Sequence, residues 1–144
     1  MPSEKRKFGD IGEKIAVSWL KNKGFSILDR NYLKKWGEID IVAKQKRNIH
    51  FIEVKSVSCD LSLNKTENKK QQEWGRDSFR PEENVHPAKL KRLHRTIESY
   101  LIEKNIFQED LEQTEGDWQL DVAVVYLDTI NKLAKVEMLE NIVD

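Results

Sequence analysis

Two apolar segments, 36–43 and 49–57, constrain the fold of this chain more than any other feature. Only the short charged stretch 44–48 separates them. Both segments are rich in β-branched and other apolar residues, which favour strands. Because the connection is too short for a crossover, we expect the two strands to pair as an antiparallel hairpin.

The second strand of this hairpin carries an acid and an amine at alternate positions. Successive side chains of a strand point to opposite faces, so Glu53 and Lys55 share one face while Ile52 and Val54 share the other. The apolar neighbours favour burial, which holds the two ionisable groups beside the core. Asp40 lies on the partner strand and is expected to reach the same place.

The remaining periodicities predict helices alternating with strands. We expect a helix over 8–22 and another over 87–103, where Pro87 suits a first helical turn. Further strands are expected near 25–28, 118–127 and 133–139. This order predicts an α/β (α+β) fold with a central mixed sheet flanked by helices. We expect one domain over 1–144, with a long polar loop at about 60–85.

Composition excludes several classes of protein. Cys59 is the only cysteine, so an internal disulfide and a zinc site of several thiolates are both excluded. The N-terminal residues have no apolar stretch of the kind found in a signal peptide, and no apolar run approaches the roughly 20 residues that cross a bilayer. We therefore expect a cytoplasmic protein without a membrane partner. The net charge of zero does not decide whether nucleic acid is bound.

The acids and the amine suit metal-dependent cleavage of phosphodiester bonds. Mg²⁺ prefers oxygen ligands, which Asp40, Glu53 and the main-chain carbonyl of Val54 would supply to Mg²⁺ or Mn²⁺. Lys55 would orient a water molecule or stabilise developing negative charge. The alternative is a solvent-exposed ion pair between Glu53 and Lys55, which is common on strands and of little energetic value.

The segments GEID at 37–40 and FIEVK at 51–55 resemble the PD-(D/E)XK nuclease superfamily. More closely, the chain resembles the bacterial YraN-type family, which is similar to archaeal Holliday-junction resolvases. The resemblance implies a restriction-endonuclease-like fold, with Asp40 and Glu53 as metal-binding acids and Lys55 as the catalytic lysine. It also implies that Glu13 in the first helix adds to the site. The chain departs from the family pattern at Val57, where relatives usually carry Arg.

These residues predict a magnesium-dependent endonuclease acting on DNA, with branched or structured DNA as one candidate substrate and a homodimer implied by the resolvase-like relatives. We expect the basic side chains at the start of the second helix to contact backbone phosphates: Lys89, Lys91, Arg92 and Arg95. The alternatives are a nucleic-acid-binding protein that uses the same fold without cleavage, an RNA-cleaving enzyme, and a small structural module.

Overall fold

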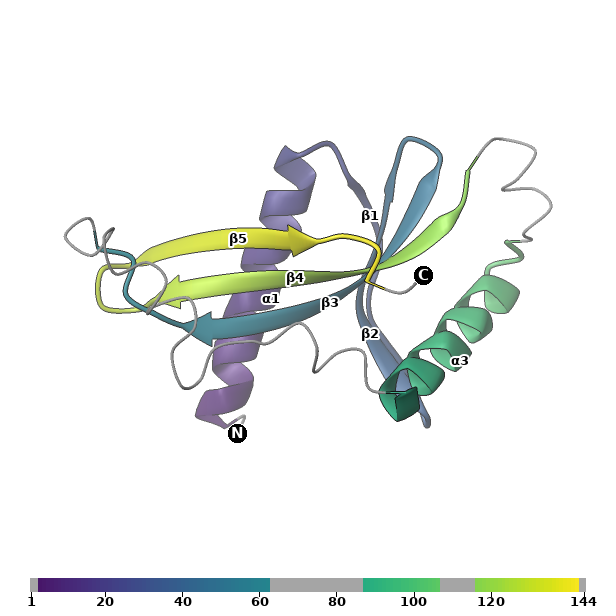
Figure 1. Cartoon of the computed structure of the whole chain (residues 1–144), viewed down its shortest axis with the longest axis horizontal. Helices are drawn as coiled ribbons and strands as arrows, with labels where there is room; N and C mark the ends of the chain where they lie inside the picture. The colour runs from purple at the N-terminus through teal and green to yellow at the C-terminus, as the bar shows by residue number, and fades with distance from the viewer. Residues whose placement is uncertain (1–2, 63–86, 107–115, 143–144) are drawn as a thin grey trace.

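A five-stranded sheet organises the protein, in the order β1-β2-β3-β4-β5. The structure is a computed structural model that describes residues 3–62, 87–106 and 116–142 (Figure 1). The loop predicted at about 60–85 lies outside these residues from position 63 onward. In chain order the elements are α1 (Glu4–Asn22), β1 (Ser26–Lys34), β2 (Gly37–Gln45), β3 (Asn48–Ser58), α3 (Pro87–Glu103), β4 (Trp118–Asp128) and β5 (Leu133–Leu139).

The sheet is mixed, as the sequence predicts. The β1–β2, β2–β3 and β4–β5 pairs are antiparallel, whereas β3 and β4 run parallel. The predicted hairpin is confirmed as the β2–β3 pair, and β5 is confirmed as an edge strand. β3 and β4 lie in the middle of the sheet, where their β-branched and aromatic side chains are covered on both faces.

The two described helices cover opposite faces of the sheet, which Figure 1 shows with α1 behind the strands and α3 beside β2. On the α1 face, Ala16 and Leu20 pack against Ile41 and Ile52. On the α3 face the core is formed by helix and strand residues together: Leu93, Ile97, Tyr100, Ile39, Val42 and Phe51. Neither of these helices combines the length and apolar character that crossing a membrane requires.

Two element boundaries differ from the sequence-based prediction. The first helix begins at Glu4, earlier than predicted, because the Ser3 hydroxyl caps it by accepting a hydrogen bond from the Arg6 amide at 3.1 Å. The strand predicted near 25–28 extends to Lys34. Its alternation is obscured because the pairing register shifts between Ile27 and Asp29, so polar side chains interrupt the expected pattern.

Candidate metal-binding site at the fork of the sheet

The centre of the candidate site is a fork between β2 and β3. Their pairing ends at Ile41 and Ile52, while β2 continues toward Gly37 paired only with β1. Beyond the fork the Val54 amide donates a hydrogen bond to Asp40 Oδ2 at 2.8 Å. A side-chain carboxylate therefore takes the place of the strand partner at this point. The N–H and C=O of a strand residue point to the same edge, so the carbonyl oxygen of Val54 faces the fork as well.

Glu53 and Lys55 lie on the face of β3 that α3 covers, as the alternation of side chains predicts. Glu53 Oε1 is 3.7 Å from Lys55 Nζ and 2.7 Å from Lys89 Nζ in the first turn of α3. The other oxygen, Oε2, is buried and accepts no hydrogen bond from the described residues. A buried carboxylate oxygen without a donor carries an uncompensated desolvation cost. Glu53 therefore retains unused capacity to bind a cation.

Glu13 approaches the fork from α1 because the helix packs very closely against β3. A Cβ atom at Gly12 would lie 1.8 Å from Ser56 Oγ and 3.0 Å from Ser56 Cβ, so any larger residue would force the Ser56 side chain to move. Glu13 Oε1 accepts a hydrogen bond from Arg30 at 3.4 Å. Burial raises the pKa of Glu13 despite this guanidinium. The predicted contribution of Glu13 is consistent with this position beside the acids of the fork.

Asp40 is the acid whose ionisation is most strongly affected by the site. Burial, together with the nearby carboxylates of Glu13, Glu38 and Glu53, raises its pKa from 3.8 to about 6, although the hydrogen bond from the Val54 amide opposes the change. The fork thus collects negative charge in a partly buried place. Such a site favours either a proton or a cation.

The composition of the fork suits a hard divalent cation, with the orphaned Glu53 oxygen as the main observation in support. Oxygen donors from Asp40, Glu53 and the Val54 carbonyl match the ligands that Mg²⁺ and Mn²⁺ prefer. Within residues 3–62, 87–106 and 116–142, no three His, Cys, Asp or Glu side chains are grouped closely enough to form a metal centre alone. A metal ion at this place would therefore need the main-chain oxygen in addition to the two carboxylates.

Only one of the four basic residues predicted to contact phosphate reaches the fork. Lys89 pairs with Glu53. Lys91 and Arg92 are exposed on α3, and the Arg95 guanidinium lies 4.1 Å from the ring centroid of Trp36. All four residues lie on the helix that borders the site, and their contact with backbone phosphates stays a prediction.

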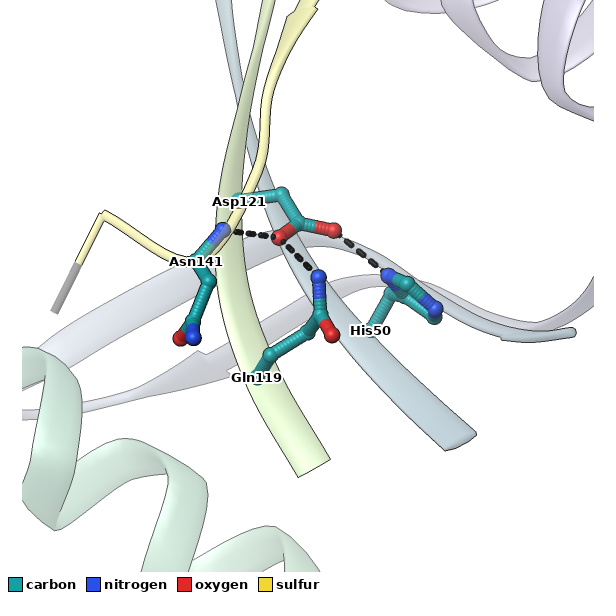
Figure 2. A network of polar contacts seen from close by, with 4 residues as sticks. All are labelled: His50, Gln119, Asp121 and Asn141. Carbon is teal, nitrogen blue, oxygen red and sulfur yellow. Dashed lines mark hydrogen bonds and ion pairs between the residues drawn. The ribbon is translucent and has the colours of Figure 1, made fainter. Parts of the chain in front are cut away.

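A second polar group, around Asp121, was not identified as a unit from the sequence (Figure 2). Asp121 Oδ2 accepts from His50 Nδ1 at 2.6 Å, and Oδ1 accepts from the Gln119 side chain and the Asn141 amide, each at 2.8 Å. His50 and Asp121 are buried. Because His50 alternates with Phe51, the network lies on the face of β3 away from Glu53 and ties the segment after β5 to β4.

A five-stranded mixed sheet with a helix on each face, and acids at the fork of its central hairpin, is an α+β fold of the restriction-endonuclease-like class. The sequence comparisons then identify the family. It belongs to the uncharacterised protein family UPF0102, whose family model matches residues 12–125. This confirms the YraN-type resemblance, and the matched range includes Glu13, Asp40, Glu53 and Lys55.

Individual relatives agree over nearly the whole chain. A UPF0102 protein of Alkaliphilus oremlandii is 35% identical over 136 residues, which are 94% of this chain and 97% of that protein. One from Campylobacter lari is 36% identical over 129 residues, 90% of this chain and 92% of that protein. One from Clostridium botulinum is 32% identical over 136 residues, 94% of this chain and 93% of that protein.

Proposed function

We propose that this protein is a metal-dependent endonuclease that hydrolyses phosphodiester bonds in DNA. The observation that carries the proposal is the fork itself, where the Asp40 carboxylate accepts from the Val54 amide, the neighbouring Glu53 raises the pKa of Asp40, and Lys55 lies 3.7 Å from Glu53. The oxygens of Asp40, Glu53 and Val54 would hold Mg²⁺ or Mn²⁺. When bound, such an ion supplies Lewis acidity and lowers the pKa of a coordinated water molecule.

The residues of the chain have separate parts in this proposal. Val54 holds the Asp40 carboxylate toward the fork through its amide, so the acid is oriented before any ligand arrives. The Lys55 amine, 3.7 Å from Glu53, stands where it can stabilise negative charge that develops on a phosphate oxygen. Glu13 adds negative charge next to Asp40, which strengthens attraction for a cation. Nucleic acid would lie along α3, where basic side chains meet backbone phosphates without reading sequence.

One observation favours a second function, a nucleic-acid-binding protein without cleavage. The amines of Lys55 and Lys89 both lie near Glu53 Oε1 and partly neutralise it. A protein with this fold that no longer binds a metal would also show these ion pairs between lysine and Glu53. The two functions differ in their need for a divalent ion, because a binder requires none.

Cleavage assays with a matched variant test the proposal. The protein is incubated with Mn²⁺ and linear, flapped, four-way and single-stranded DNA, beside matched RNA substrates. We expect cleavage of DNA that is lost in Glu53→Gln and retained in Glu98→Gln, an exposed glutamate on α3. Equal cleavage by the wild type and Glu53→Gln would contradict the proposal. DNA binding without cleavage under any metal would favour the nucleic-acid-binding function. Cleavage of RNA but not of DNA would identify RNA as the substrate.

A further inference from the structure

The first turn of α3 has an unusual charge. It contains no acidic residue, and Lys89 lies within it. A cation near a helix N-terminus is unfavourable because the helix dipole is positive there. A partner on another element offsets this cost. That partner is Glu53 of β3, whose Oε1 lies 2.7 Å from Lys89 Nζ.

The contact between Lys89 and Glu53 is closer than the one predicted from the sequence. Lys55 and Lys89 approach the same oxygen, but Lys55 remains 3.7 Å away. The side chains of Lys89 and Glu53 are 26% and 17% exposed, so the pair is only partly screened by water. Lys89 thus supplies the nearest described positive charge to an acid proposed as a metal ligand.

We infer that Lys89 is a resident counter-cation of Glu53 that competes with the divalent ion for this carboxylate. The inference rests on the proposed function. In the ion-free protein the amine neutralises Glu53 and keeps α3 against β3. The amine occupies Oε1 of a carboxylate whose Oε2 accepts no hydrogen bond from the described residues, so an ion that binds both oxygens of Glu53 must displace the amine. Lys89 is then a positioning residue that sets the affinity of the site for the divalent ion.

Displacement of the Lys89 amine from Glu53 would also allow it to bind a second partner, a backbone phosphate. An amine released from Glu53 remains in the first turn of α3, beside the place where a backbone phosphate would lie. A phosphate oxygen accepts a charge-assisted hydrogen bond as well as a carboxylate does. Loading of the ion and binding of the nucleic acid would therefore favour one another, as linkage requires when both depend on the same movable group.

Isothermal titration of the full chain with Mn²⁺ tests the competition without measuring activity. We expect Lys89→Met and Lys89→Gln to bind Mn²⁺ about fivefold more tightly than the wild type, the change expected when one partly buried ion pair no longer has to be broken. Lys89→Arg keeps the positive charge, so its affinity should stay near the wild-type value. Urea unfolding in EDTA establishes that each variant is folded before the titration.

The matched control is Lys34→Met, which removes an amine from another lysine–glutamate pair, that of Lys34 with Glu103. Its Mn²⁺ affinity should equal that of the wild type. Unchanged or weaker binding in the neutral Lys89 variants would overturn the inference while leaving the nuclease proposal intact, as would equal tightening in Lys34→Met. Absence of Mn²⁺ binding in the wild type and in every variant would overturn both.

Discussion

Replacement of Asp40 by asparagine should stabilise the metal-free protein. The structure holds this carboxyl in a partly buried position among other acids, with a pKa of about 6 instead of 3.8. At roughly 1.4 kcal/mol per pH unit, that difference corresponds to an upper limit of about 3 kcal/mol of stability lost on ionisation. Asparagine has no charge, and its carbonyl oxygen can still accept the hydrogen bond from Val54.

The direction of the Asp40 pKa shift determines how the stability of the protein depends on pH. Because the pKa is raised, the folded protein holds a proton that the unfolded chain has lost between pH 3.8 and about 6. Stability therefore falls as the pH rises through this window and stays reduced above it. The advantage of Asp40→Asn should be close to zero near pH 4 and should grow to between about 1 and 3 kcal/mol at pH 8.

Urea unfolding in EDTA, followed by circular dichroism between pH 4 and pH 8, measures this difference. Glu98→Gln removes a carboxylate from the exposed face of α3 and should show little change across the same range. With Mn²⁺ in place of EDTA, the wild type should regain stability that Asp40→Asn does not. A variant that is less stable at pH 8, or a difference that does not vary with pH, would refute the reasoning.

Three further changes test the packing around the sheet by urea unfolding, the first two at neutral pH and the third between neutral and acidic pH. Gly12→Ala should cost about 1–2 kcal/mol because its Cβ would collide with β3, whereas Gly9→Ala has open space and should be neutral or stabilising; equal effects would contradict the close approach. Asp121→Ala should cost about 3 kcal/mol because His50 loses its buried partner, and a loss below about 1 kcal/mol would show that the network contributes little. Amides of Asn131 and Leu61 lower the pKa of Asp128, so Asp128→Ala should destabilise the protein above pH 3.8, with a deficit that fades as the pH falls; a constant deficit would contradict this.

The fork could be predicted from the sequence because the residues that form it lie on two strands that are neighbours in the chain. Apolar residues alternate with Glu53 and Lys55 along one strand, and a short turn places Asp40 on the next. Strand geometry alone then decides which side chains share a face. The structure agrees, with Ile52 in the core on the α1 face and Glu53 directed toward α3.

The contacts that join distant elements could not be predicted in this way. The ion pair of Lys89 with Glu53 depends on where α3 docks, and no periodicity within either segment contains that information. The same holds for His50 and Asp121, which are 71 positions apart and meet only because β3 and β4 pair in parallel. Local patterns specify elements and faces, whereas docking is specified by packing of the whole core.

The amide proton of Val54 is a natural spectroscopic probe of the fork. Most amides in a central strand are held by a neighbouring peptide group, which does not titrate, but this one is held by a carboxylate. Its chemical shift and its rate of exchange with deuterium should therefore respond to protonation of Asp40 and to any ion that the acid binds. In protein labelled with nitrogen-15, this single resonance would follow both events in solution without a substrate or a substitution.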